Sequence, residues 1–197
     1  MARGRKRKPG KRHPCGKLVR PSSGETQAQI LATVVDARQR HYRVTAAQAR
    51  DQRLSSALGR LAFAGTISQQ QYEAGQRFGE VYHRHHVVTG LPLPSPSSVS
   101  GVMASAGIFG GSGGPPDADL IEKVRRHYDE ALQVLARCDR DRRAMPGQPP
   151  SRLVYRIVCL DEDASDLRDH DRHSLHHGLD ELGYLFGLVR ESSRKLL

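Results

Sequence analysis

Apolar residues recur along this chain mainly three and four positions apart, the spacing of an amphipathic helix. The clearest stretch is Thr45–His86. Within it, Thr45 with Gln48 and Ser68 with Gln71 each have the spacing of a capping box, in which a hydroxyl and an amide side chain bond the backbone where a helix begins. The pattern predicts two capped helices joined as an αα-hairpin.

Each helix of this predicted hairpin carries its own signals. The first has one apolar stripe, made by Leu54, Leu58 and Leu61, and Gly65 ends it. Ile67 and Tyr72 then stand at the two positions of a hydrophobic staple on the second helix. The second helix also contains Gly75 and Gly79, each of which costs about 1 kcal/mol relative to alanine in a helix interior. We expect the close approach of a neighbouring helix to explain both glycines, with simple tolerance as the alternative.

Glu25–Arg43 is a further predicted helix, with apolar residues on one side and cations at its end. The apolar residues are Ile30, Leu31, Val34 and Val35, and the cations are Arg38, Arg40, His41 and Arg43. Cations in a last turn oppose the negative end of the helix dipole. We favour this structural role over a surface that faces DNA.

Asp117 is expected to cap a helix that continues to about Arg137, followed by a solvated charged end over Asp139–Arg143. The apolar face predicted for this helix consists of Ile121, Val124, Tyr128, Leu132 and Leu135.

The C-terminal segment has a less regular pattern. Arg152–Asp161 fits either a short strand or a helix, and Ala164–Arg168 fits one or two helical turns. Beyond Ser174 one helical face is clear, made by Leu175, Leu179, Leu182 and Phe186 and continued by Val189. A helix, a short helix and a helix is the order that a helix-turn-helix requires; packing or dimerisation is the alternative use of this segment.

These elements predict a mainly α protein, a small helical bundle whose parts are joined by linkers rich in proline and glycine. The predicted order is a disordered basic arm over 1–22, a helical region with the hairpin over 23–90, a Pro/Gly/Ser-rich linker over 91–116, an amphipathic helix over 117–143, a linker over 144–151 and a C-terminal helical module over 152–197.

Charge separates the first twenty residues from the rest. They contain nine cations and no carboxylate: Arg3, Arg5, Lys6, Arg7, Lys8, Lys11, Arg12, Lys17 and Arg20. The other 177 residues carry 22 basic and 21 acidic side chains, so the arm supplies nearly all of the formal net charge of +10. Cations this dense repel one another, which favours an arm without compact structure.

The arm predicts contact with double-stranded DNA. Arg3-Gly4-Arg5-Lys6 resembles the core of an AT-hook, in which an Arg-Gly-Arg strip enters the narrow, electronegative minor groove of A·T-rich DNA. A merely solubilising basic tail is the alternative.

Two segments resemble bacterial protein families. Leu61–Ser68 followed by Tyr72–Phe78 resembles uncharacterised alphaproteobacterial and prophage proteins, which implies a phage or prophage origin. Val158–Leu160 with Ser174–Gly187 is similar to the C-terminal region of alphaproteobacterial regulators, including activators of gene transfer agents. In that family the segment is a DNA-binding module led by basic residues.

The resemblance to these regulators implies that Arg172, His173 and His176 contact nucleic acid. Asp180 and Glu181 lie beside them, which departs from the basic recognition helix of the family.

Candidate chemistry beyond charge is sparse. His173 and His177 are one helical turn apart, a usable pair for zinc, and His83, His85 and His86 form a second group. No H-E-x-x-H, paired cysteine or supporting carboxylate accompanies them, and no Ser-His-Asp arrangement stands out. We therefore predict no metal, no cofactor and no enzyme.

Cys159, inside an apolar run, is expected to belong to the core. The three cysteines are odd in number and far apart, which suits a reducing cytosol. No apolar run approaches the length of a membrane span, and the first twenty residues lack the apolar stretch of a secretory signal.

The sequence thus predicts a phage- or prophage-encoded DNA-binding accessory protein, a transcriptional regulator in the first instance, cytoplasmic and associated with the host nucleoid. Its helices are candidates for homo-oligomerisation. The alternative is a structural or DNA-packaging protein of the particle, similar to a small terminase subunit or associated with the virion.

Overall fold

The computed structural model describes residues 12–19, 23–91 and 118–188. These residues are mainly helical, as the sequence predicted. They divide into two compact units, one that ends at Asp51 and one that begins at Gln52. The helical region predicted over 23–90 is therefore divided between the two units, and the linker predicted over 91–116 lies outside the described residues apart from Leu91.

The first unit contains α1 (Ser23–Tyr42), which matches the helix predicted there. Its Ile30 and Leu31 are exposed, at 58% and 57%. Arg38 reaches past the end of the helix, where Nη1 donates to the carbonyl oxygens of Ala49 (3.2 Å) and Asp51 (3.3 Å). This cation thus ties the chain after α1 back to the helix, in line with the structural role that we favoured.

Thr45 and Gln48 make both hydrogen bonds of the predicted capping box. The Gln48 amide donates to Thr45 Oγ1 at 3.3 Å, and the Thr45 amide donates to Gln48 Oε1 at 3.0 Å. Yet they start only η1 (Gln48–Arg50), a single 3₁₀ turn, because Asp51 after it is extended with φ −63° and ψ 124°. The prediction of one continuous helix from Thr45 to Leu61 is wrong.

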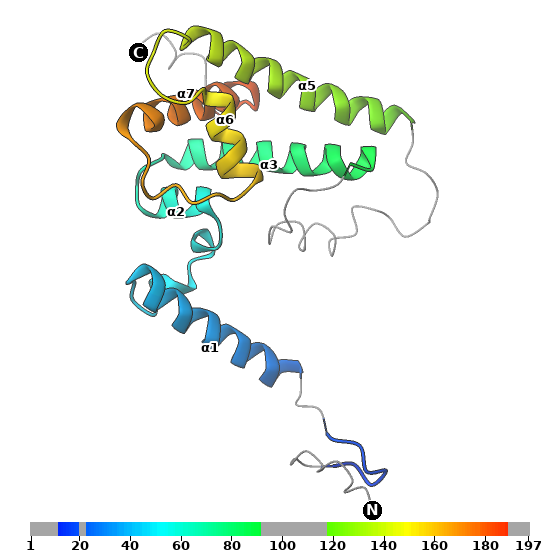
Figure 1. The fold of residues 1–197 in the computed structure, drawn as a ribbon. Helices are drawn as coiled ribbons and strands as arrows, with labels where there is room; N and C mark the ends of the chain where they lie inside the picture. Colours follow the sequence, from blue (N-terminus) through cyan, green and yellow to red (C-terminus); the bar gives the residue numbers. More distant parts are fainter. Residues whose placement is uncertain (1–11, 20–22, 92–117, 189–197) are drawn as a thin grey trace, which may run out of the picture. The chain divides into compact units, whose positions relative to one another are not determined.

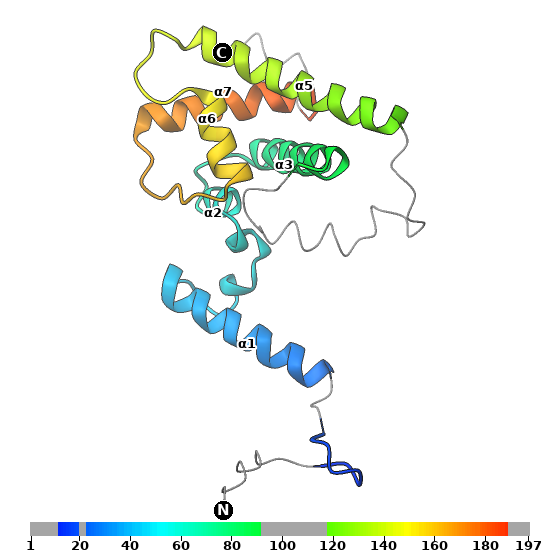
Figure 2. The same cartoon turned by 45° about the vertical axis from the view of Figure 1, so that its right-hand side comes forward.

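The second unit is a bundle of helices. In chain order its elements are η2 (Gln52–Ser55), α2 (Ala57–Phe63), α3 (Gln69–Thr89), α5 (Ala118–Asp141), α6 (Pro150–Val154), the π-helical turn η3 (Tyr155–Cys159) and α7 (Asp169–Leu185). Figures 1 and 2 show α5, α7 and α3 as neighbouring long helices, with the short α6 across them.

α2 begins much later than predicted because the backbone before it folds back on itself. Ser56 is its N-cap, and the Ser56 hydroxyl accepts from the Gly59 amide at 3.1 Å. A Cβ atom on Gly59 would lie 2.0 Å from the carbonyl oxygen of Arg53, so only glycine lets η2 lie against α2.

The second half of the predicted hairpin is confirmed. Ser68 and Gln71 form a complete capping box at the start of α3. Gly65 has a φ of 72°, the left-handed region, and follows the C-cap of α2, where the chain turns toward α3. A Cβ atom on Gly75 would lie 2.6 Å from Leu58 Cδ2 and 3.3 Å from Leu179, so the expected close approach is also observed.

α7 lies at the centre of the bundle, in contact with α3, α5 and α6. Its Leu175, Leu179 and Leu182 are completely buried, which confirms these three residues of the predicted apolar face; Phe186 is half-buried, and Val189 lies outside the described residues. Each such side chain contributes about 1.5–3 kcal/mol through burial of apolar surface. Gly178, on the same helix, allows Val154 and Pro150 to pack within 3.0 and 3.3 Å of where its Cβ would be.

The face of α5 differs from the prediction. Val124 and Leu135 are buried as expected, but Leu132 is 40% exposed. Ala131 and Cys138 are buried instead, so the buried face of α5 includes small side chains where the prediction placed Leu132. The helix also extends through Asp141, beyond the predicted end near Arg137.

The C-terminal segment is helical where the sequence left two choices. Arg152–Asp161 falls largely in α6 and η3, and Cys159 is 8% exposed, a core residue as predicted. Ala164–Arg168 is not helical, which corrects the prediction of one or two turns there. Just before it, the side chains of Asp161 and Asp163 bond residues of α2, about a hundred positions earlier.

Candidate nucleic-acid interface

Most of the predicted DNA-contacting residues of the arm lie outside the described residues: Arg3, Arg5, Lys6, Arg7, Lys8, Lys11 and Arg20. Arg12 and Lys17 are described, within a tight turn over residues 12–19. Arg12 and Leu18 form an antiparallel bridge across it, and the His13 amide donates to the Lys17 carbonyl at 2.8 Å. Residues 12–19 therefore have local structure that the prediction of a disordered arm did not include.

This turn holds its cations at the surface. Gly16, with a φ of 81°, permits the reversal, and Arg12 Nη1 donates to the Gly16 carbonyl at 2.8 Å. Arg12 and Lys17 are both exposed, as is every residue from 12 to 19. The turn thus has no packed interior of its own, and its charges are accessible to an anionic partner.

The three predicted contacts on α7 are less available. Arg172 Nη1 lies 3.4 Å from Asp169 Oδ1, and His173 Nδ1 lies 2.8 Å from the Asp169 carbonyl oxygen. His176 is half-buried, and its Nε2 is shielded from solvent. From Asp171 to Tyr184, only Arg172 and His173 are exposed.

The order of elements also differs from a helix-turn-helix. Residues 160–168 connect η3 to α7, a longer connection than the three- or four-residue turn of that motif. A recognition helix needs an open face to enter a groove, whereas α7 packs against three other helices. The geometry fits the alternative use of this segment, packing in the core.

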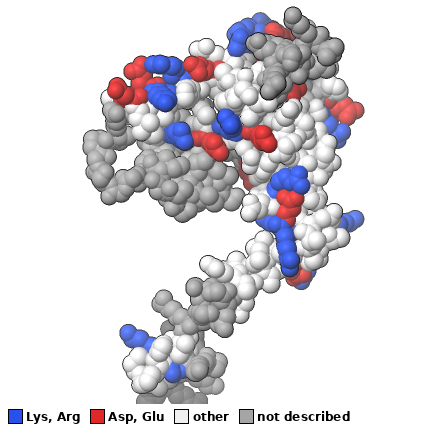
Figure 3. All heavy atoms as spheres, turned by 180° about the vertical axis from the view of Figure 1, so that it is seen from behind, with Lys and Arg blue, Asp and Glu red and all other residues white. Residues whose placement is uncertain are grey.

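Charges of both signs are mixed on one face of the helical unit (Figure 3). On the face shown in Figure 3, Lys and Arg side chains lie among Asp and Glu side chains and do not gather into one basic surface. Two ion pairs lie within single helices, Arg126 with Glu122 and Arg172 with Asp169. This agrees with the nearly neutral composition of the chain outside the arm.

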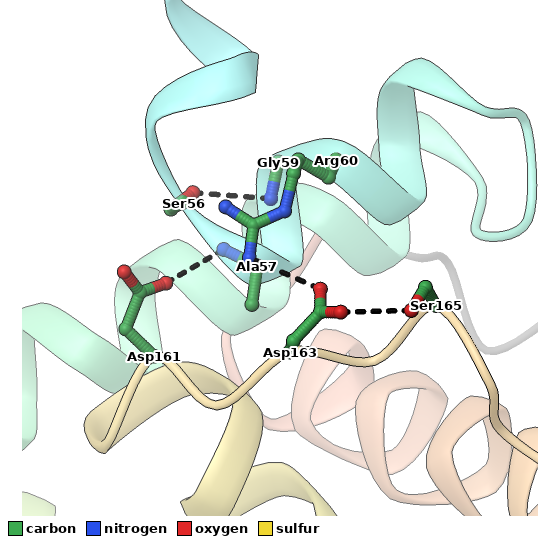
Figure 4. Close-up of polar contacts among 7 residues, drawn as sticks. All are labelled: Ser56, Ala57, Gly59, Arg60, Asp161, Asp163 and Ser165. Atoms are coloured by element: carbon green, nitrogen blue, oxygen red, sulfur yellow. Dashed lines mark hydrogen bonds and ion pairs between the residues drawn. The ribbon is translucent and has the colours of Figure 1, made fainter. Parts of the chain in front are cut away.

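The loop before α7 is fastened to α2 by acidic side chains that sequence reasoning missed (Figure 4). Asp161 Oδ1 accepts from the Ala57 amide at 2.6 Å, and Asp163 Oδ1 accepts from Arg60 Nη2 at 3.3 Å. The Ser165 hydroxyl donates to Asp163 at 2.7 Å. That hydroxyl, followed by Arg60, holds the pKa of Asp163 below its usual value.

Asp161 has an unusual backbone conformation, with a φ of 54°, which asparagine and aspartate adopt more readily than most residues. Asp161→Ala removes the acceptor for the Ala57 amide and adds backbone strain, so we expect a loss of about 2 kcal/mol of unfolding free energy. Asp161→Asn keeps an acceptor oxygen and the tolerance for this φ, and should lose less than half as much. Urea unfolding of both variants measures the difference; equal losses would contradict this role.

A cleft of about 690 Å³ lies beside this loop, lined among others by Gln148, Arg156, Arg168, His170 and Asp171. Its polar side chains largely satisfy one another. Asp171, 7% exposed, accepts from the Gln148 amide at 2.8 Å, and Arg156 donates to Gln148 Oε1 at 2.9 Å and to Glu162 at 2.6 Å. The bond to Asp171 holds the 146–148 turn onto α7, and the bonds of Arg156 tie Gln148 and Glu162 to η3, a structural role.

The predicted histidine groups do not form a metal site in the described part of the chain. Among those residues, no three His, Cys, Asp or Glu side chains gather where they could hold one ion. Nor is any described helix long and apolar enough to cross a membrane.

The histidines of α3 belong instead to an aromatic cluster. The Tyr82 ring lies 4.2 Å from the His86 ring, and the Tyr82 hydroxyl lies 3.4 Å from that of Tyr155. The His85 ring stacks on Tyr128 at 4.3 Å and 22°. Burial and then the bond to Tyr155 raise the pKa of Tyr82 far above its usual value. The density of His and Tyr in 82–86 was the only sequence signal, since two of the partners, Tyr128 and Tyr155, lie on other elements.

Comparison with protein-family models, with curated proteins and with solved structures gives no match to this chain.

Proposed function

We propose that this protein is a DNA-binding accessory protein whose basic N-terminal segment contacts double-stranded DNA. The observation that carries the proposal is the charge asymmetry of the chain: nine cations and no carboxylate in the first twenty residues, against a net charge of +1 in the other 177. Cations at this density bind phosphates with affinity that does not depend on base sequence.

The described residues support different roles for the basic N-terminal segment and the helical unit. Arg12 and Lys17 are exposed on a turn with no interior, whereas the helical unit carries charges of both signs. The one helix with a family resemblance to a DNA-binding module, α7, is mostly buried. We therefore assign phosphate and minor-groove contact to the basic N-terminal segment. We assign to the helical unit the role of positioning that segment, a role that self-association of the helical unit would reinforce.

The salt dependence of duplex binding tests this proposal. If about six of the nine cations meet phosphates, log K should fall with log salt at a slope of about −5. Fluorescence anisotropy of a labelled duplex at 50 to 300 mM NaCl measures the slope. A slope near zero, or no binding at 50 mM NaCl, would overturn the proposal.

Regulation of transcription is our first choice of role, in a phage or prophage setting. A DNA-packaging or structural protein of the particle is the second candidate, since it also needs cations for nucleic acid. Selection of bound oligonucleotides from a random pool separates the two: a shared sequence motif supports the regulator. Large assemblies by light scattering, with no selected motif, support the second.

A further inference from the structure

His85 lies in a setting that suits only its neutral form. Its ring stacks on Tyr128 of α5, with centroids 4.3 Å apart, and lies edge-on to His86 at 5.8 Å. Its Nδ1 atom is shielded from solvent and has no hydrogen-bond partner among the described residues. A proton on both ring nitrogens would place a charged donor there without an acceptor, which is costly in a protein interior.

Of the groups around His85, His86 and Arg125 disfavour a proton on its ring, and Asp129 favours one. The titratable or charged groups that face this cluster are His83 and His86 of α3, Arg125, Tyr128 and Asp129 of α5, and Tyr155 and Cys159 of η3. Of these, only Asp129 favours a cation. Burial, then His86, lower the pKa of His85; Asp129 opposes them and Arg125 adds to them. Burial and His86 also lower the pKa of His83, which is 9% exposed.

The same cluster holds the C-terminal half of α3 in the bundle. Tyr82 is 4% exposed and contacts both Tyr128 of α5 and Tyr155 of η3 through ring faces and edges. η3 is a π-helical turn. Such turns are rare in proteins, and many of those that occur lie at functional sites. Beyond Tyr82, the residues of α3 from His85 to Thr89 are only half-buried, so little else holds this end.

We propose that protonation of His85 in mildly acidic solution releases residues 82–89 of α3 from α5 and η3. The sign follows from linkage. A released His85 takes up a proton at its ordinary pKa of about 6.5, whereas the packed His85 does so only at lower pH. Packing is therefore strongest above pH 6.5. Below pH 6.5 the equilibrium constant for packing falls by up to about tenfold per pH unit. The fall ends where the pH is low enough for the packed His85 itself to take up a proton.

Amide hydrogen exchange of the full chain at pH 7.5 and 5.5 tests this, after correction for the intrinsic exchange rates. We expect protection of residues 82–89 to fall by up to about tenfold at pH 5.5, while residues 69–78 of the same helix change less than twofold. His85→Gln, which keeps a polar side chain but takes up no proton, should reduce the difference between the two pH values to the part that His83 contributes. His127→Gln, at an exposed position of α5, is the matched control and should keep the full difference.

Two results would overturn the proposal: equal protection of 82–89 at both pH values in the natural chain, or a His85→Gln variant that responds to pH as the natural chain does. An NMR titration of the histidine side chains in the natural chain gives an independent check if the variant fails to fold. It should place the pKa of His85 below 6.5, and a value at or above 6.5 would refute the mechanism.

Discussion

Deletion of residues 1–20 should lower the affinity for duplex DNA at least about a hundredfold in 50 mM NaCl. Neutralisation of about six phosphates alone changes affinity by about a thousandfold between 50 and 200 mM salt, and the deletion removes that contribution. It removes nine cations and leaves a chain with a net charge of +1. Anisotropy measurements on both proteins give the ratio, and the residual slope against log salt should approach zero.

Two controls isolate the charge of the segment. Replacement of all nine cations by glutamine keeps the length of the segment and should weaken binding as much as the deletion does. Substitution of the two exposed α7 residues, Arg172→Ala with His173→Ala, should change affinity less than about threefold, since both side chains already have partners in the helix. Unchanged affinity after the deletion would refute our assignment. A large loss in the α7 variant alone would restore the family-based prediction for that helix.

Gly59→Ala should destabilise the helical unit by about 3 kcal/mol, although alanine is the better helix former. The added methyl group would lie 2.0 Å from the Arg53 carbonyl oxygen and 2.7 Å from the Arg53 carbonyl carbon. These are backbone atoms, so relief requires η2 to move away from α2. Urea or thermal unfolding measures the change, and a small shift in midpoint would mean that η2 does not lie where we describe it.

Gly79→Ala provides the matched comparison, because Gly79 is also a helical glycine. Its Cβ would lie 3.2 Å from Val158 Cγ1, the end of a side chain, and no other atom crowds it. The gain in helix propensity, about 1 kcal/mol, offsets the adjustment of Val158. We therefore expect stability within about 1 kcal/mol of the natural chain.

The parts of the fold that the sequence predicted well depend on residues near one another. The capping box of Ser68 and Gln71 involves atoms three residues apart, and both bonds are present. The stripe of Leu175, Leu179 and Leu182 follows from helix periodicity, and its burial is complete. Such signals are local, so a single sequence is enough to recognise them.

The failures involve contacts that the local apolar pattern does not specify, between residues six to about a hundred positions apart. Thr45 has a correct capping box, but the helix does not continue because the backbone near Arg53 packs on Gly59. Residues 164–168 fit helical turns by pattern, whereas Asp161 and Asp163 next to them bond Ala57 and Arg60, about a hundred positions earlier. Nothing in the local sequence specifies these pairs.

The candidate site shows the same limit. The density of cations in the first twenty residues is visible in the sequence, and so is the spacing of the histidines in 83–86. For the histidines the sequence analysis considered only metal, which it did not predict, whereas in the structure the His85 ring stacks on a tyrosine of α5. The resemblance of α7 to a DNA-binding module contained no information on burial, which depends on α3, α5 and α6 together.

The central position of α7 has a consequence for how the protein is made. During synthesis α2, α3 and α5 are made first. α7, against which α3 and α5 pack, is complete only at Leu185. Until α7 leaves the ribosome, the side chains of Phe78 and Leu135 have no completed core in which to pack. Exposed apolar faces of this kind attract chaperones and aggregate. Shortened versions that stop before α7 should therefore be insoluble or rapidly degraded in cells, whereas those trimmed at the other end should accumulate normally.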